Sequence, residues 1–196
     1  MDARGRAARR RRPRRAAPKG GRDRVRVHDR PGSPTAQPGT ARRRSSAAQG
    51  TTPEPLAILK VEAYDPQGDG EENNRLTPTI YDGDNDTGWY SENYRSDAFG
   101  GLKDGVGVIV DLGPNKKPQT VELVMPEPSD VEVHIGPDNR LEGATKIGEK
   151  QDADGTVKFD VPAEVSGQYV VVWFTKISQA DNGKRRAWLN EVVVTG

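Results

Sequence analysis

The acids of one short loop have the clearest chemical potential in the chain. Asp82, Asp84 and Asp86 alternate along this loop, and the hydroxyl of Thr87 follows directly. Carboxylates at alternate positions can turn their oxygens toward one hard cation, and calcium takes six to eight oxygen ligands. The loop is not an EF-hand, because Thr87 and Asn93 stand where that motif needs Gly and Glu. Two interpretations stay open, a calcium loop and a polar turn whose Asp side chains cap their own backbone.

Aromatic and basic side chains gather just after this loop, between residues 88 and 105. Aromatic rings can cover the apolar faces of a sugar while neighbouring polar groups bind its hydroxyls. A large ring directly before a strand is more often buried, and we expect this for Trp89. The candidate ligand-binding residues of this segment are Tyr90, Tyr94, Arg95, Phe99 and Lys103.

A second group of candidates lies nearer the C-terminus, in the run Lys184-Arg185-Arg186. Guanidinium groups there can bind a pyrophosphate or a carboxylate of a ligand. A solvated surface loop explains the same run. We take Arg185 as a further ligand-binding candidate and residues 176–186 as a second binding loop.

Few residues of the chain are suited to catalysis. The sequence has no cysteine, which excludes disulfides and thiolate nucleophiles, and its two histidines are His28 and His134. Alternation places His134 on the solvent-facing side of a strand, with no sign of a Ser-His-Asp triad or a zinc site. The many acids lie in polar, Gly-rich loops, whereas a glycosidase needs one carboxyl in an apolar pocket. We therefore do not expect an enzyme.

The two ends of the chain differ in charge. Residues 1–50 hold 16 Lys and Arg against 3 Asp, whereas residues 51–196 hold 14 against 26 Asp and Glu. Residues 1–55 have almost no large apolar side chain and are predicted to be a disordered Arg/Pro/Ala-rich tail, although a spurious start would give the same composition. Such a tail binds nucleic acid or anionic lipid only nonspecifically. The sequence contains neither an apolar run of membrane-span length nor a signal peptide.

Residues 56–196 change to a pattern of short alternating strands separated by turns that contain Gly or Pro. No amphipathic helix of useful length interrupts them. This pattern is typical of an all-β jelly roll or β-sandwich, which we predict over residues 56–196. The predicted strands are 56–64, 106–112, 119–125, 131–135, 156–161, 168–175 and 187–195.

Several of these stretches resemble a known family. Asp82-Gly-Asp84 with Thr87-Gly-Trp89, strand 106–113 and the end 189–196 resemble the discoidin or coagulation factor V/VIII type C domains. Those domains share the galactose-binding-like jelly roll with family 32 carbohydrate-binding modules. More narrowly, residues 64–72 with 94–103 are similar to the C-terminal extracytoplasmic domain of actinobacterial MviN-type lipid II flippases and related membrane pseudokinases.

The resemblance implies a structural calcium ion that ties the acidic loop to the chain end. In the carbohydrate-binding modules, such an ion is held by the acidic loop and a Glu near the C-terminus. The chain departs from the pattern at Gly88, where the modules usually have a basic residue, and it lacks the cysteines of many discoidin domains. The matching ligand positions are the Tyr81 carbonyl, Asp84, Thr87 and Glu191.

The expected function is non-catalytic binding of a carbohydrate or a cell-wall precursor, as an accessory to a membrane protein of peptidoglycan synthesis. One alternative is a protein-interaction module without a sugar site, and another is polyanion binding through the basic tail. The resemblance implies the extracytoplasmic face of the membrane or the cell wall if the chain is a fragment of a membrane protein. A chain complete as written would be cytoplasmic.

Overall fold

A computed structural model describes residues 53–196, and the predictions for residues 1–52, including those for the basic tail, lie outside this range. No helix in the described range is long and apolar enough to cross a membrane. Two short 3-10 helices accompany the strands, η1 (Asn74–Ile80) and η2 (Phe99–Gly101). The strands are β1 (Lys60–Tyr64), β2 (Trp89–Tyr90), β3 (Val106–Asp111), β4 (Thr120–Gly136), β5 (Thr145–Asp160), β6 (Tyr169–Ile177), β7 (Trp188–Leu189) and β8 (Glu191–Thr195).

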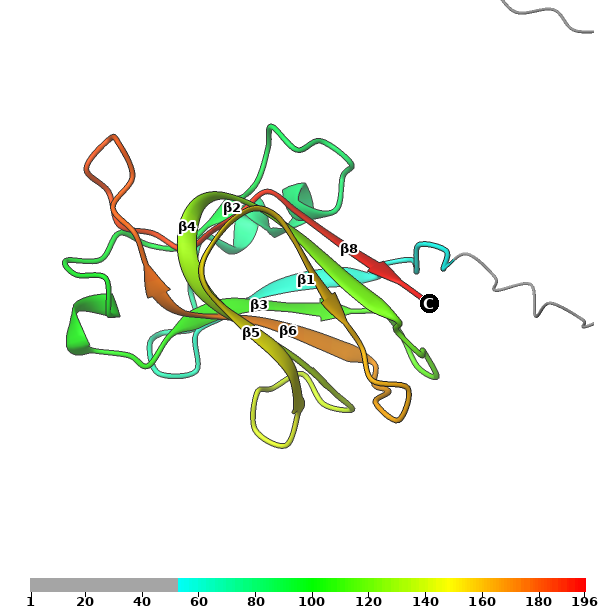
Figure 1. Ribbon diagram of the computed structural model, residues 1–196. Coiled ribbons are helices and arrows are strands. Elements are labelled where there is room, and N and C mark those ends of the chain that lie inside the picture. The colour runs from blue at the N-terminus through cyan, green and yellow to red at the C-terminus, as the bar shows by residue number, and fades with distance from the viewer. Residues whose placement is uncertain (1–52) are drawn as a thin grey trace, which may run out of the picture. The chain divides into compact units, whose positions relative to one another are not determined.

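One long bent hairpin, β4–β5, joins the two layers of the fold. The antiparallel sheet has the order β1-β3-β6-β4-β5, and β8 pairs with the first half of β4. Thr120–Val124 therefore lies between β8 and β5, whereas Val131–Gly136 lies between β6 and β5. The register of β4 against β5 shifts between Met125 and Ser129, where the hairpin curls from one layer to the other (Figure 1). Strands β2 and β7 form a separate two-stranded ribbon.

The core lies between the layers and is built from alternate side chains of the strands. A fully buried Val, Leu or Phe contributes about 1.5–3 kcal/mol relative to an exposed one, so these alternating rows hold the layers together. The rows of fully buried residues include Val106, Val108 and Val110 of β3, Val170, Val172 and Phe174 of β6, and Val121 and Leu123 of β4.

Five strand predictions differ from the structure, and one of them, 187–195, is two strands, β7 and β8, which pair with different partners. The predicted strands 119–125 and 131–135 are one strand, β4, because Pro126 falls in the bend where the ladder is already interrupted. Strand β5 begins at Thr145, not at residue 156, because its first half is polar and exposed and gives no apolar alternation. Residues 56–59 precede β1 and cross between layers, since Leu56 N bonds to Val194 O and Leu59 N to Asp111 O.

His134 lies on the outward face, as predicted, but it is only 8% exposed and so does not face solvent. Its strand runs between β5 and β6 in the middle of a layer, where neighbours on both sides limit exposure. Its ring nitrogen Nε2 lies 2.9 Å from a carboxylate oxygen of Glu132. This pairing gives His134 a structural partner.

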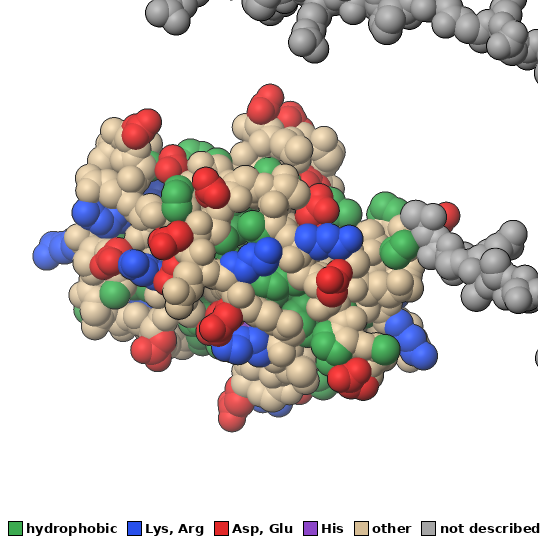
Figure 2. Space-filling view, viewed as in Figure 1, with side chains coloured by type: hydrophobic (Ala, Val, Ile, Leu, Met, Phe, Trp, Pro, Cys, Tyr) green, Lys and Arg blue, Asp and Glu red, His purple; other side chains and the backbone are tan. Residues whose placement is uncertain are grey.

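The domain already includes the last residues assigned to the tail. Pro55 forms a bridge with Thr195, and the backbones of Glu54 and Gly196 exchange hydrogen bonds. On the face seen in Figure 2, Lys and Arg side chains alternate with Asp and Glu. This face therefore offers no single-sign patch for a polyanion.

Candidate functional site

Backbone hydrogen bonds join the two loops that contain the candidate ligand-binding residues. Tyr94 N donates to Arg185 O at 2.9 Å, and Ile177 N donates to Asp97 O at 3.0 Å. A side-chain bond from Arg185 N to Asn93 Oδ1 adds to them. Segments about 90 residues apart in sequence therefore form one surface, which includes the candidates Arg95 and Arg185.

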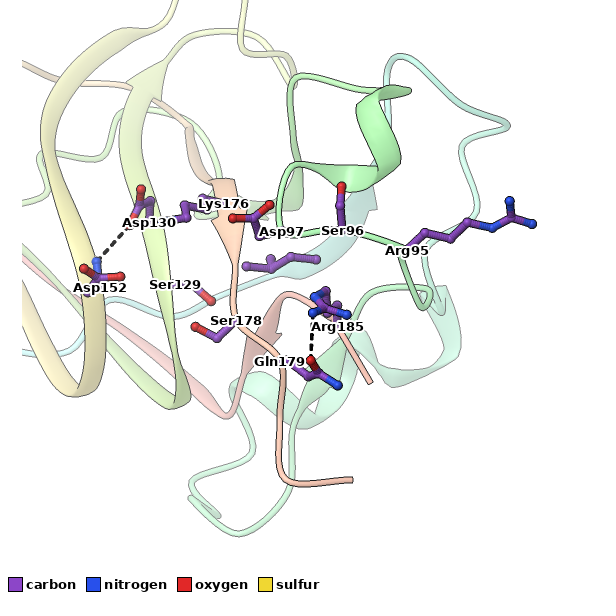
Figure 3. Close-up of a pocket in the computed structure, with 11 residues that line it drawn as sticks. Arg95, Ser96, Asp97, Ser129, Asp130, Asp152, Lys176, Ser178, Gln179 and Arg185 are labelled. Carbon is purple, nitrogen blue, oxygen red and sulfur yellow. Dashed lines mark hydrogen bonds between the residues drawn. The ribbon is translucent and has the colours of Figure 1, made fainter. Parts of the chain in front are cut away.

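A cleft of about 610 Å³ lies between these loops and the bend of the β4–β5 hairpin (Figure 3). Polar side chains line most of it, and its apolar floor includes Ile177, which is 1% exposed. None of the lining residues is aromatic. Six lining residues are charged, namely Arg95, Asp97, Asp130, Asp152, Lys176 and Arg185.

None of these six charges forms an ion pair with another group within residues 53–196. Arg185 donates from Nη2 to the neutral Gln179 Oε1 at 2.7 Å. Asp130 Oδ1 accepts from the backbone N of Asp152 at 2.8 Å. Ser129 is only 2% exposed, and its hydroxyl has no hydrogen-bond partner in the described part of the chain. The cleft thus presents free hydrogen-bonding groups, which suit a ligand rich in hydroxyls.

Tyr94 and Lys103, both predicted to bind ligand, share a largely buried polar network. Lys103 Nζ lies 2.8 Å from Asp65 Oδ2, 2.9 Å from Glu72 Oε1 and 3.0 Å from the Tyr94 hydroxyl. The Tyr94 hydroxyl also donates to Glu72 Oε1. The side chains of Asp65 and Glu72 are fully buried, so the network is held inside the domain.

This network keeps both of its proton donors protonated. Burial by itself lowers the pKa of Lys103, but hydrogen bonds to Asp65, Tyr94 and Glu72 outweigh it and raise that pKa above its usual range. Burial, and then the bond to Glu72, raise the pKa of the Tyr94 hydroxyl. The second oxygen of Glu72 accepts from Glu92 N at 2.6 Å, which fixes the following loop.

The rings of Phe99 and Tyr90 also pack against other side chains of the domain. Phe99 is fully buried with its ring edge-on to Tyr94 at 5.1 Å, and it borders a second cleft of about 700 Å³ together with Tyr94, Arg95 and Lys103. The guanidinium of Arg186 lies 4.4 Å from the centre of the Tyr90 ring, and Trp188 packs against the same ring at 5.4 Å. Trp89 is buried, as expected.

The remaining cleft residues were not predicted from the sequence. Asp130 and Asp152 come together because β4 pairs with β5, and the polar first half of β5 is not recognisable as a strand. Asp97 lies between residues that were candidates and looks like any loop acid. Asp130 could have been placed at the bend only if residues 119–135 had been predicted as one continuous strand through Pro126.

The acidic loop forms the turn that one interpretation predicted. Asp82 Oδ1 accepts from Asp84 N at 2.9 Å, and Asp84 Oδ1 accepts from Asp86 N at 3.0 Å. The Thr87 hydroxyl lies 3.1 Å from both Asp82 Oδ2 and the carbonyl of Asp84. These side chains therefore cap their own backbone.

One of the predicted calcium ligands, Glu191, is a buried carboxylate. Glu191 begins β8 and is 7% exposed, and its Oε2 has no hydrogen-bond partner in residues 53–196. Burial raises the pKa of Glu191, and the charges of Asp82 and Asp84 raise it further. Within the described chain, no three acidic or histidine side chains already converge as a metal site. The implied set has only two carboxylates, Asp84 and Glu191, and the free oxygen of Glu191 fits a cation between them.

Gly88 cannot be replaced by the basic residue that related modules usually have. A Cβ at this position would lie 2.7 Å from the Leu189 carbonyl oxygen and 2.9 Å from the Cα of Asn190. Asn190 donates from Nδ2 to Asn85 O at 2.7 Å and so holds the acidic loop against the chain end. The close backbone contact explains this departure from the family pattern.

Solved structures with similar folds are known. No protein-family model matches the chain, and no curated protein matches it. The chain is similar to the CBM32 of AlyQ in complex with 4,5-unsaturated mannuronic acid, with 17% identity and a TM-score of 0.52 over 72% of this chain and 97% of that one. It is similar to a mutant of chitosan-binding module 1 from a chitosanase/glucanase of Paenibacillus sp. IK-5, with 20% identity and a TM-score of 0.52 over 74% and 100%.

A truncated AlyQ with CBM32 and alginate lyase domains is similar at 16% identity and a TM-score of 0.54, covering 74% of this chain, which spans only 34% of that protein. At such identities the likeness shows the fold alone. The predicted galactose-binding-like jelly-roll β-sandwich is therefore confirmed. The narrower resemblance to the flippase domain stays a prediction.

Replacing Lys103 by Met should destabilise the domain strongly. Two buried carboxylates would lose their shared cation, and breaking a buried pair in this way costs about 3–5 kcal/mol. The matched control is Lys60→Met, which removes an exposed ion pair with Glu62 and should cost less than about 1 kcal/mol. The free energies of unfolding of the two variants in urea test this, and equal losses would contradict it.

The domain should also lose stability at alkaline pH. Lys103 and Tyr94 both have raised pKa values in the folded state, so their stabilisation is complete below about pH 10, the range of their unfolded values, and falls as the pH rises further. Urea unfolding between pH 8 and 11 should show this fall, with a shallower slope for Lys103→Met. A free energy of unfolding that stays flat above pH 10 would rule this out.

Proposed function

We propose that the domain is a non-catalytic module that binds a glycan in the cleft between the two loops and the β4–β5 bend. The observation that carries this proposal is the cleft itself, where six charged side chains that form no ion pair within residues 53–196 border one opening. The fold supports it, since one similar structure is a CBM32 in complex with an unsaturated mannuronic acid and another is a chitosan-binding module.

Binding in this cleft would rely on hydrogen bonds more than on stacking, because no aromatic ring lines it. Backbone hydrogen bonds such as Tyr94 N to Arg185 O hold the loop wall in place before a ligand binds. Because this wall is already ordered, binding costs less conformational entropy, and more of the free energy of the polar contacts contributes to affinity. The cleft volume lies in the usual range for small-ligand sites.

We further propose that the glycan is a cell-wall fragment or precursor and that the module serves a membrane protein on the extracytoplasmic side. The support is the resemblance of residues 64–72 and 94–103 to the flippase domain. Arg185 and Arg95 at the cleft are able to bind the carboxylate or pyrophosphate groups of such ligands.

A protein-interaction role is the second candidate, and it is favoured by a different surface. This second cleft of about 700 Å³ is lined by Leu102, which is 79% exposed, by four acids and by two basic residues, namely Asp69, Glu71, Glu72, Glu92, Arg95 and Lys103. An exposed leucine among acids suits a basic, partly apolar partner protein. Loss of partner capture in Leu102→Ser, with glycan binding intact, would assign this role to the second cleft.

We also propose that a calcium ion ties the acidic loop to β8, with the Tyr81 carbonyl, Asp84, Thr87 and Glu191 as ligands. The support is the unpartnered, buried Oε2 of Glu191 beside acidic neighbours. An ion there would neutralise the repulsion and join residues more than 100 positions apart. Its role would be structural, because the loop lies outside the residues of the proposed glycan cleft.

Blocking the cleft should abolish glycan binding. Ser178 lines the cleft, and Ser178→Trp should fill it and weaken binding of any glycan by at least about tenfold, the loss of roughly 1.4 kcal/mol of contacts. The control is Ser166→Trp in an exposed loop. Glycan-array screening of the full chain identifies a ligand, and calorimetry compares the variants. Absence of any bound glycan, or equal affinity in Ser178→Trp, would overturn the proposed function.

Calcium should raise the unfolding temperature of the full chain. Calcium at 100 times its dissociation constant stabilises by about 2.7 kcal/mol, which corresponds to several degrees. Glu191→Gln should remove this shift, and in chelator it should be at least as stable as the original chain because a buried charge is gone. Asp86→Asn, which changes a loop acid outside the ligand set, should keep the shift. No shift in the original chain would exclude the ion.

A further inference from the structure

The acidic and the basic side chains of the cleft lie mostly on opposite walls. Asp130 and Asp152 stand on the strand wall made by the β4–β5 bend, and Arg185 stands on the loop wall. Figure 3 shows Ser129 and Ser178 between these two walls. Lys176 of β6 also belongs to the strand wall, and Asp97 and Arg95 belong to the loop wall, so the formal net charge is −1 on the strand wall and +1 on the loop wall.

The acidic wall keeps a carboxylate free. Asp152 has a positive φ of 46°, a conformation that few residues other than Gly adopt, and its side chain accepts no hydrogen bond in residues 53–196. Asp130 uses one oxygen for the backbone of Asp152, which leaves its other oxygen available. Lys176 is the strand neighbour of Asp130 and offsets part of this charge, but it does not come within ion-pair distance.

The basic wall keeps a guanidinium charge uncompensated. The side-chain partner of Arg185 is Gln179, which is neutral, so the hydrogen bond orients the guanidinium without cancelling its charge. Arg95 lies at the rim, where Figure 3 shows its side chain turned away from the centre. Figure 3 shows Asp97 between Lys176 and Ser96, while the guanidinium of Arg185 lies against the neutral Gln179.

One side chain between the walls, Ser129, has a buried hydroxyl. Ser129 is only 2% exposed, and its hydroxyl has no hydrogen-bond partner within the described chain. The Ser129 oxygen is closed off from solvent, so the ligand contacts come from the charged walls.

We infer that the ligand of the cleft is a zwitterionic saccharide, with an ammonium group against Asp130 and Asp152 and a carboxylate against Arg185. This inference rests on the proposed glycan-binding function and names the ligand class for the same site. A zwitterion satisfies both walls, whereas a singly charged sugar leaves one wall unpaired and a neutral one leaves both. An amino sugar joined to an acidic sugar has this pattern of charges.

Four disaccharides test the two walls separately. Glucosaminyl-N-acetylmuramic acid has both charges, its N-acetylated form has only the carboxylate, chitobiose has only ammonium groups, and diacetylchitobiose is neutral. Calorimetry with the full chain at low salt should give the tightest binding for the zwitterion, by about fivefold over either singly charged form, as expected for about 1 kcal/mol per charge contact.

Charge-neutral substitutions then assign each preference to its wall. Asp152→Asn, which tolerates the positive φ, should weaken only the two amine-bearing ligands about fivefold. Arg185→Gln should weaken only the two carboxylate-bearing ligands by the same factor. Arg140→Gln, on an exposed loop away from the cleft, is the control and should change neither.

Three outcomes would overturn the inference. If all four disaccharides bind equally and the variants do not alter this, the ligand class is wrong while the glycan site stands. If none of the four binds but array glycans bind in a manner sensitive to Ser178→Trp, the zwitterion is again wrong and the function survives. If no glycan binds at all, the proposed function fails first.

Discussion

The ammonium group of Lys103 is the contact on which the long segment between β1 and β3 depends. The chain has no cysteine, and 41 residues separate β1 from β3 with only two short 3-10 helices and a two-residue strand among them. Lys103 bonds to Asp65 at the start of this segment, to Glu72 within it and to Tyr94 near its end. A single buried cation thus fixes a stretch that regular structure does not.

This arrangement is costly, because burying charges removes them from water. The hydrogen bonds of Lys103 offset this cost only while their geometry is kept, so they hold the segment between β1 and β3 in one arrangement. Residues 91–97 then offer their backbone to the loop before β7, through bonds such as Ser91 N to Ala187 O. The opposite wall comes from the bend of β4, where the register shift exposes Asp130. The cleft therefore lies between a rigid loop pair and a rigid hairpin.

The strands were predictable where burial alternates, and less so elsewhere. β3 and β6 are apolar on the core face and were located within two residues at each end. The first half of β5 was not, because an exposed edge strand needs no apolar residue. Pro126 was taken as a strand end, whereas a proline at a bend removes no hydrogen bond that the ladder uses.

The site was predictable in its loops but not in its geometry. Arg95 and Arg185 were separate candidates, and only backbone bonds between distant loops place them around one cleft. Tyr94 and Lys103 have the residue types of a sugar site, yet their polar atoms serve buried acids. Sequence alone does not distinguish these roles, because each depends on where Glu72 lies in the fold.

The central claim is that the cleft between the loop pair and the β4–β5 bend is a glycan-binding site. Backbone amide chemical shifts of the labelled full chain, followed during titration with an array-identified glycan, test it most directly. We expect shift changes concentrated at the residues that border the cleft, namely 95–97, 129–130, 152, 176–179 and 185. Changes confined to the neighbouring cleft around Leu102, or no changes at saturating glycan, would contradict it.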